Sequence, residues 1–307
     1  MRISVIVPAF NVAPFLREAL QSVLDQTHAD WSLVVVDDGS TDGTAEVAAS
    51  FRDRRISLIR QANAGVSAAR NTGLAHAGSL APDAFLFLDG DDWLAPNALV
   101  LLADTLDAAP WAVAACGRYA RVAAGQAPRL SPAAPGGCLL EQLLTCNRFA
   151  NGGHLLIRRE AVEAAGDFRP DISYGEDWEY WSRLALHGEF TTVRSRAPVL
   201  FVRERPGSVY LSRATDPSAY RPALGAIHEN PAVTERLGAA RLAYLQRRAK
   251  AEIAWTIGRE LIRHGQHSDG RRWLVRSIRD APSLQRLTLI GLAWLRMGRF
   301  RRYRTVA

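Results

Sequence analysis

The first 115 or so residues alternate between short apolar runs and segments with helical spacing. "ISVIVPAF", "WSLVVVDDGS" and "AFLFLDGDD" are runs of strand length, rich in β-branched or aromatic residues, and each ends in small or polar residues. Between them lie helical patterns such as "APFLREALQSVLDQT" and "GVSAARNTGLAHA". Such alternation favours an α/β fold, a Rossmann-like, mostly parallel sheet with helices on both faces.

The alternation stops at Ala123–Gly137, a stretch rich in Pro, Gly and Ala that we interpret as an exposed loop. Mixed helices and strands follow, and from about Pro222 onward the pattern is helical only. We therefore expect an α/β domain over residues 1–222 and a helical extension over 223–307. Within the extension, Trp255–Pro282 is typical of a helical hairpin with a central glycine turn.

The cysteines and apolar runs favour a cytoplasmic protein. Cys116, Cys138 and Cys146 are odd in number and show no C-x-x-C spacing, so a disulfide framework is not expected. The apolar run near the N-terminus is shorter than that of a signal peptide. The longest apolar run, Leu287–Leu295, is too short to span a bilayer.

The positive charge is concentrated in the C-terminal part. Residues 225–307 carry 17 Lys+Arg against 6 Asp+Glu, whereas residues 1–224 carry 21 against 25. This asymmetry indicates either an acidic partner, such as an anionic membrane surface, or simply a solvated basic face. The aromatic residues of this part are not evenly interleaved with the basic ones, so we expect no nucleic-acid partner.

Polar residues follow each expected strand of the first part. In open α/β sheets, ligands bind at the carboxyl ends of the strands, and these loops should therefore meet at one edge. The loops are "PAFN", "DDGS", "NAG" and "DGDD", which together favour a nucleotide and a metal ion. The chain has no G-x-G-x-x-G after its first strand and no P-loop motif.

The acidic run Asp89-Gly90-Asp91-Asp92 places three carboxylates within four residues. Like charges so close repel one another, and a divalent cation is the simplest compensation. A turn followed by a helix cap is the alternative, because Pro96 begins the next helical pattern, but a cap needs only one acid. A D-x-D phosphatase is disfavoured, since Asp92 and Trp93 follow where Gly and then Thr or Val are usual.

These motifs together resemble the family 2 glycosyltransferases with the GT-A fold. The resemblance covers "SVIVPAFNVAPFLREALQSVLDQTHADWSLVVVDDGSTDGT", "NAGVSAARNTGLAHA" and "FLFLDGDDWLAP", and then the acceptor-side segment "GDFRPDISYGEDWEYWSRLALHG". It implies a nucleotide-binding half over residues 1–118 and an acceptor-binding half over 119–222.

The resemblance also implies residue roles on the donor side. The loop of Pro8, Ala9 and Phe10 would contact the base. Asp38, at the end of the second expected strand, matches the position that typically contacts the base, although the residue types of "DDGSTD" also suit helix caps and turns. Gly65 and Arg70 lie on the segment that would cover the donor, and Arg70 would approach the diphosphate or make a structural ion pair. The expected donor-binding residues are Pro8, Ala9, Phe10, Asp37, Asp38, Gly65, Arg70, Asp89 and Gly90.

For the metal, Mn²⁺ or Mg²⁺, the resemblance implies Asp91 as the main ligand. Asp89 would assist through water or by contacting the ribose, and the role of Asp92 varies within the family. The cation would stabilise the charge that develops on the leaving diphosphate.

On the acceptor side, Asp177 matches the proposed catalytic base, and Glu176 would orient the site or the acceptor. The alternative is that both acids only charge the first turn of a helix. Trp178 and Trp181 lie three apart on one helix face, where they would form a sugar-stacking wall or pack in the core.

The resemblance thus implies an inverting transferase that moves a sugar from a nucleoside-diphosphate sugar, with UDP favoured, to an acceptor hydroxyl. The expected partners are a glycan or lipid-linked acceptor of bacterial surface polysaccharide or glycolipid synthesis, and an anionic membrane face at the basic helices. Two alternatives stay open here: a nucleotidyltransferase or phosphatase using the same metal motif, and a non-catalytic scaffold that binds sugar nucleotides.

Overall fold

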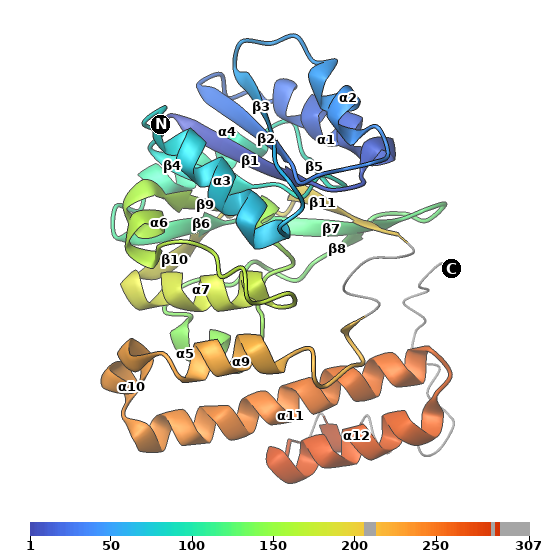
Figure 1. The fold of residues 1–307 in the computed structure, drawn as a ribbon. Helices are drawn as coiled ribbons and strands as arrows, with labels where there is room; N and C mark the ends of the chain where they lie inside the picture. Colours follow the sequence, from blue (N-terminus) through green and yellow to red (C-terminus); the bar gives the residue numbers. More distant parts are fainter. Residues whose placement is uncertain (206–212, 284–285, 289–307) are drawn as a thin grey trace. The chain divides into compact units, whose positions relative to one another are not determined.

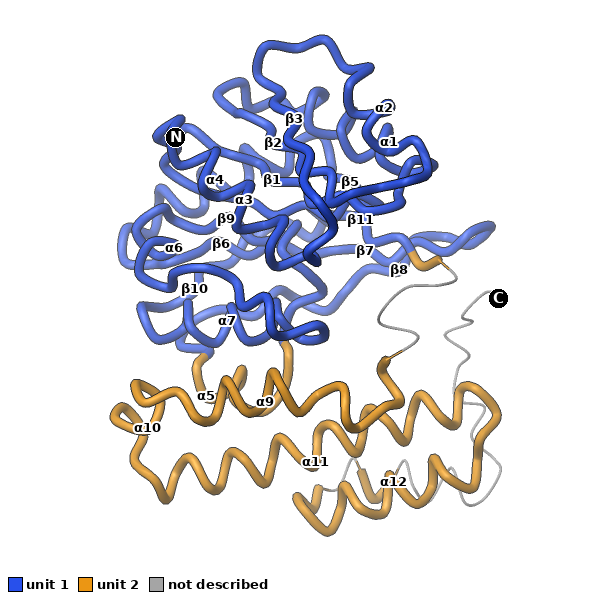
Figure 2. Tube along the Cα trace, in the orientation of Figure 1, with its two compact units in different colours: residues 1–139, 148–203 blue, residues 140–147, 204–307 orange. Residues whose placement is uncertain are grey.

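The computed structural model describes residues 1–205, 213–283 and 286–288, which fall into two compact units (Figures 1 and 2). The first comprises residues 1–139 and 148–203, and the second comprises residues 140–147 and 204–307. The first unit therefore ends before residue 222, where the sequence suggested a domain boundary, and it excludes a short internal segment. The expected division into functional halves stays a prediction.

The first unit contains the alternating strands and helices. Its strands are β1 (Ile3–Ala9), β2 (Trp31–Asp37), β3 (Ile56–Arg60), β4 (Ala84–Phe87), β5 (Trp93–Leu94), β6 (Ala112–Cys116), β7 (Arg118–Ala123), β8 (Arg129–Leu130), β9 (Leu155–Arg158), β10 (Glu189–Thr192) and β11 (Pro198–Glu204). Its helices are α1 (Ala13–Leu24), α2 (Thr44–Ala49), α3 (Val66–Gly78), α4 (Ala98–Asp107), α6 (Arg159–Ala165) and α7 (Glu176–His187), with a 3-10 turn η1 at Gly152–His154.

The central sheet has seven strands in the order β10-β6-β9-β4-β1-β2-β3. β1 pairs in parallel with β2 and β4, β2 with β3, and β10 with β6. β9 runs antiparallel between β4 and β6. The mostly parallel sheet expected from the alternation is confirmed, and its parallel strands β1, β2 and β4 end at one edge.

Strand β1 shows why both faces of this sheet are covered. Ile3, Val5 and Val7 belong to one apolar cluster with residues of α1 and α4, such as Leu16 and Leu102. On the opposite face, α3 packs against β1 and β2, and a Cβ at Gly73 would lie only 2.4 Å from Ile6 and 3.4 Å from Val36. Since alternate side chains of a strand point to opposite faces, a strand covered on both sides must be apolar throughout, as "ISVIVPA" largely is.

A second, smaller sheet has the order β5-β11-β7-β8. Its strand β8 lies inside Ala123–Gly137, which was interpreted as a loop. Strand β5 directly follows the acidic run and pairs antiparallel with β11, with Trp93 opposite Phe201 and Leu94 opposite Leu200. The small sheet therefore ties the loop after β4 to a strand more than 100 residues later.

The second unit is helical in its described residues. It contains α5 (Leu140–Leu143), α9 (Arg221–His228), α10 (Pro231–Leu237), α11 (Ala239–Arg263) and α12 (His267–Asp280). α11 and α12 form the expected hairpin, with Gly265 in the left-handed region (φ 80°) between them. No helix among the described residues is long and apolar enough to cross a membrane. The Leu287–Leu295 run falls largely outside the described residues.

Candidate active site

The end of strand β1 presents an exposed aromatic ring. Pro8 and Ala9 are buried within the strand, whereas Phe10, just beyond it, is 48% exposed. Asn11 follows with a positive φ of 52° and accepts a hydrogen bond at its Oδ1 from the backbone N–H of Thr41 (2.9 Å). The loops after β1 and β2 are thus joined beside a ring whose exposure suits base stacking.

The two aspartates at the end of β2 are both buried, with 0% and 3% exposure. Asp37 accepts hydrogen bonds from the backbone N–H of Ser40 (3.1 Å) and from the Nε of Arg60 (3.2 Å), whose side chain is 62% exposed. This aspartate therefore combines the turn-stabilising role considered from the sequence with an ion pair to the next strand.

Asp38 is engaged by the loop after β3. Its Oδ1 accepts from the Nε2 of Gln61 (2.7 Å) and the backbone N–H of Ala64 (2.9 Å), and its Oδ2 accepts from the backbone N–H of Gly65 (2.8 Å). Gly65 has a φ of 91° and directly precedes α3, so Asp38 fixes the segment expected to cover the donor. Its contact with a base stays a prediction.

Arg70 connects the two ends of the expected site. It lies on α3, is 4% exposed, and donates from one guanidinium nitrogen to Oδ1 of Asp89 and from another to Oε1 of Glu176, each at 3.1 Å. Its guanidinium also lies 5.2 Å from the ring centroid of Phe168. Of the two roles considered for Arg70, the structure shows the ion pairs; its Nε is buried without a hydrogen-bond partner.

The acidic pair Glu176-Asp177 begins helix α7, behind Gly175 with a φ of 79°. Asp177 accepts a hydrogen bond from the backbone N–H of Trp178 (2.6 Å). Burial and the neighbouring Glu176 raise the pKa of Asp177 to about 7, with Arg70 opposing the shift. A carboxylate with a pKa near neutrality can accept a proton from a hydroxyl group that is losing it in a reaction.

The acidic run after β4 divides into two kinds of carboxylate. Asp92 is 3% exposed and accepts from the Nδ2 of Asn151 (2.6 Å) and the backbone N–H of Arg203 (2.8 Å). Burial raises the pKa of Asp92 well above its usual range, and Asp89 and Asp91 add to this effect. Asp89 keeps 31% side-chain exposure, and Asp91 is half-buried.

The described residues contain no group of three or more His, Cys, Asp or Glu side chains arranged to hold a metal ion. Asp92 has both oxygens engaged by protein donors, which leaves Asp89 and Asp91 as candidate ligands. Mg²⁺ and similar cations are commonly bound by one or two carboxylates together with substrate phosphates. The donor set therefore fits a metal that is bound together with a diphosphate, and does not fit a site closed by protein ligands alone.

The two tryptophans considered from the sequence pack in the interior instead, and so does His154. Trp178 and Trp181 are 4% and 1% exposed, so they form core and not a sugar-stacking wall. His154 is 1% exposed; its Nδ1 lies 2.9 Å from the carbonyl oxygen of Gly117, and its Nε2 accepts from the backbone N–H of Ala150 (3.2 Å). Burial lowers its pKa to about 4, which describes a neutral structural histidine.

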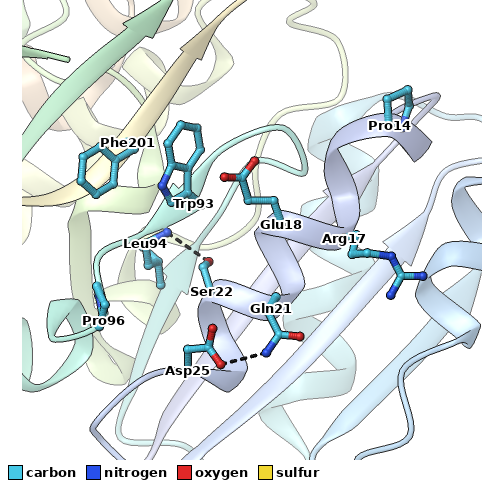
Figure 3. A pocket seen from close by; sticks show the side chains of 10 residues that line it. All are labelled: Pro14, Arg17, Glu18, Gln21, Ser22, Asp25, Trp93, Leu94, Pro96 and Phe201. Carbon is cyan, nitrogen blue, oxygen red and sulfur yellow. Dashed lines mark hydrogen bonds between the residues drawn. The ribbon is translucent and has the colours of Figure 1, made fainter. Parts of the chain in front are cut away.

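A pocket of about 600 Å³ lies beside this site, between α1 and the strands β5 and β11 (Figure 3). Glu18 of α1 points across it toward Trp93, whose ring stacks on Phe201 with centroids 5.3 Å apart. None of its lining residues was expected as a site residue from the sequence.

Comparison with known proteins gives one family match: the model described as Glycosyl transferase family 2 matches residues 4–166. Among curated relatives, the chain is 40% identical over 95 residues to the UDP-Glc:alpha-D-GlcNAc-diphosphoundecaprenol beta-1,3-glucosyltransferase WfgD of Escherichia coli, covering 30% of this chain and 36% of that protein. The first three curated matches cover 13% to 34% of those relatives' lengths, so this chain spans only a minor part of the relatives it matches.

Two solved structures share the fold. Staphylococcus aureus TarS 1-349 in complex with UDP-GlcNAc aligns with a TM-score of 0.68 at 18% identity, covering 96% of this chain and 88% of that one. The mannosyltransferase PcManGT of Pyrobaculum calidifontis, in complex with GDP-Man and Mn²⁺, aligns with a TM-score of 0.60 at 22% identity, covering 99% and 83%. At these identities the likeness concerns the GT-A fold.

Proposed function

Because this chain belongs to glycosyl transferase family 2, we propose that it is an inverting, metal-dependent glycosyltransferase that uses a nucleoside-diphosphate sugar. The nucleotide would bind at the carboxyl ends of β1 and β2, with its base against Phe10. The loop held by Asp38 would cover the donor up to Gly65. UDP is the favoured nucleotide, since UDP-sugars are named for both TarS and WfgD, although PcManGT is named with GDP-Man.

A divalent cation, Mn²⁺ or Mg²⁺, would be held by Asp91, with Asp89 assisting directly or through water. When bound it would neutralise charge on the leaving diphosphate. Arg70 would keep Asp89 in place by its ion pair. Asp92, with both oxygens occupied by Asn151 and Arg203, would not be a ligand.

Asp177 would act as the general base. It would take the proton of the acceptor hydroxyl as the acceptor oxygen forms its bond to the anomeric carbon. The bond from that carbon to the diphosphate oxygen would break on the opposite side, and the nucleoside diphosphate would leave with the electron pair, which inverts the anomeric configuration. Glu176, fixed by Arg70, would position the base and the acceptor.

The observation that supports this mechanism most is the pairing of one buried guanidinium with acids from two distant motifs. Asp89 belongs to the expected metal loop and Glu176 to the expected acceptor segment, yet both bind Arg70 at 3.1 Å. In a catalytic site, the residues that assist the leaving group and the general base must lie close enough together to act on the same bound substrates. A scaffold that only binds a nucleotide has no such need for the acids of α7.

The test compares Asp177→Asn with Asp171→Asn, the latter a matched change at an exposed aspartate paired with Arg169. Each protein is incubated with sugar nucleotides and Mn²⁺, and the products are identified. We expect nucleoside diphosphate as the phosphate-containing product, with turnover lost in Asp177→Asn and kept in Asp171→Asn. Orthophosphate or pyrophosphate would instead indicate the phosphatase or nucleotidyltransferase alternative, and equal rates in the two variants would exclude Asp177 as the base.

For the acceptor, we propose a hydroxyl of a growing bacterial surface glycan or of a lipid-linked sugar. The name of WfgD, which specifies a diphosphoundecaprenol-linked acceptor, supports this class. The second unit would bring the enzyme to the cytoplasmic face of an anionic membrane, because α11 and α12 carry exposed Arg248, Lys250, Arg272, Arg276 and Arg279.

A further inference from the structure

Strand β11 ends beside the acidic loop that follows β4. Its pairing with β5 places Phe201 opposite Trp93. Arg203, two residues further along β11, is therefore brought to the residues that precede Trp93. Nothing in the sequence connects positions 91 and 203, and the strand pairing makes the connection.

Arg203 makes two hydrogen bonds to consecutive residues of this loop. Its backbone N–H donates to Oδ1 of Asp92 (2.8 Å), and its Nε donates to the backbone carbonyl oxygen of Asp91 (2.9 Å). The remaining part of the guanidinium pairs with the carboxylate of Glu18 on α1. The side chain keeps 22% exposure.

The same guanidinium packs against two aromatic rings. It lies 4.7 Å from the ring centroid of Trp93 and 5.1 Å from that of Phe15. Contacts of this kind hold a planar cation in one orientation. The Nε that donates to the Asp91 carbonyl is thereby directed by the rings of Trp93 and Phe15.

Asp92 also holds the loop after β4, through hydrogen bonds on the side away from Arg203. Its Oδ2 accepts from the Nδ2 of Asn151 (2.6 Å), and the Oδ1 of Asn151 in turn accepts from the backbone N–H of Gly153 (2.9 Å). The third carboxylate of the acidic run thus has a structural task, which is to hold the loop between η1 and β11.

We propose that Arg203 is a positioning residue for Asp91. Its side chain fixes the backbone carbonyl of Asp91 and so sets the place from which the Asp91 carboxylate reaches a divalent cation. Its backbone N–H holds the Asp92 side chain, and that contact is kept when only the side chain at position 203 is changed. Groups that hydrogen-bond to the ligand-bearing segment orient the ligand and commonly change metal affinity by 10–100-fold when removed. This inference rests on the proposed function, because it assumes that Asp91 is a metal ligand.

The role requires the fork of an arginine. A lysine ammonium at position 203 can pair with Glu18 or with the Asp91 carbonyl, but its point charge does not reproduce the planar pair of donors. Replacing Arg203 with lysine therefore keeps the positive charge and removes the planar pair of hydrogen-bond donors.

The experiment measures Mn²⁺ binding in the presence of UDP by electron paramagnetic resonance, on the full chain. For Arg203→Met and Arg203→Lys we expect an apparent Mn²⁺ dissociation constant raised by about tenfold or more. Turnover of the sugar nucleotide should recover in both variants when Mn²⁺ is raised in proportion. Glu18→Gln, which removes only the pair to α1, and Arg17→Met, a matched arginine on the same helix that bonds to Ser50, should change the constant by less than about threefold.

Hydrogen exchange without metal provides a readout that does not depend on activity. The amides of residues 89–94 should exchange faster in Arg203→Met than in the unmodified chain, and at the unmodified rate in Arg17→Met. Unchanged exchange together with unchanged Mn²⁺ affinity in Arg203→Met would overturn the positioning role. An equal loss in Glu18→Gln would also overturn it, since the ion pair to α1 would then be the cause.

The two proposals fail in different ways. If the unmodified chain binds no Mn²⁺ with UDP, the proposed function fails, and the positioning role fails with it. If the unmodified chain binds them and Arg203→Met binds them equally well, only the positioning role is refuted.

Discussion

Replacement of Arg70 by methionine tests the buried charge cluster that this residue forms with Asp89 and Glu176. The side chain is 5% exposed, and its partners Asp89 and Glu176 are 31% and 14% exposed. Removing one partner of a buried ion pair costs about 3–5 kcal/mol, because the remaining charges lose their compensation. Since Asp89 keeps contact with water, we expect a loss near the lower limit, about 3 kcal/mol, in the free energy of unfolding at pH 8.

The loss should depend on pH in a definite direction. Arg70 lowers the pKa of both Asp89 and Asp177 relative to what burial alone would give. Without it, these carboxyls have still higher pKa values in the folded protein than in the unfolded chain, so folding binds protons and stability falls as pH rises. The difference between Arg70→Met and the unmodified chain should therefore be smaller at pH 5 than at pH 8.

The assay is urea unfolding followed by tryptophan fluorescence and circular dichroism at both pH values, without metal. Arg169→Met serves as control, because Arg169 and its partner Asp171 are exposed (46% and 62%), and such pairs contribute about 0–1 kcal/mol. A loss of less than about 1 kcal/mol in Arg70→Met at pH 8, or an equal loss at the two pH values, would refute the reasoning.

Three further outcomes are expected. With its pKa raised to about 7, Asp177 would act as the proposed base only in its deprotonated form, so turnover should rise through pH 7 and be about tenfold lower at pH 6 than at pH 8. Asp177→Asn should lose about 10²–10⁴-fold and show no such step, and a flat profile in the unmodified protein would count against a titrating base. Gly258→Val should lower the stability of the α11–α12 hairpin by about 1–3 kcal/mol in urea unfolding, because a Cβ there would lie 2.8 Å from the carbonyl oxygen of Gly270. An unchanged midpoint of the urea unfolding curve would contradict this packing. The chain should float with vesicles that contain anionic lipid and not with zwitterionic ones. The double variant Arg272→Glu/Arg276→Glu should bind more than tenfold more weakly, because each basic charge near the surface contributes about 1 kcal/mol. Equal flotation with both vesicle types would exclude the electrostatic contact.

The strand and helix order was predictable because each element carries its own local pattern. "ISVIVPA" and "WSLVVVD" are apolar on both faces, as parallel strands between two helical layers must be. The direction of β9 was not predictable, since the short run "LLIR" fits either direction. The small sheet was also missed, because strands of two residues such as β5 and β8 are too short to show a period.

At the site, the sequence indicated which residues have chemically useful side chains, but not which residues each of them contacts. The acids at positions 89 and 91 were singled out from residue type and place in the chain, and those at positions 176 and 177 from the resemblance to the family. That Arg70 bridges two of them depends on a contact across 106 residues, and no local pattern encodes it. Asp38 was expected at the base and is found bonded to the segment from Gln61 to Gly65, again through long-range contacts.

Asp92 shows most clearly that local sequence does not identify the long-range contacts of a residue. As one of three neighbouring acids it could have been a ligand, a helix cap or a structural group, and the acidic run itself does not distinguish these roles. Its partners Asn151 and Arg203 lie 59 and 111 residues away. Only the folded structure shows that Asp92 helps to hold the loop after β4 in place.

The most direct test of the central claim is donor turnover. The unmodified chain and Asp91→Ala are incubated with UDP-, GDP- and dTDP-sugars in the presence of Mn²⁺, with and without EDTA, and released nucleoside diphosphate is measured. The account predicts release from one class of donor that is abolished by EDTA and in Asp91→Ala. Release that persists in EDTA and in Asp91→Ala would contradict a metal-dependent transferase built on this acidic loop.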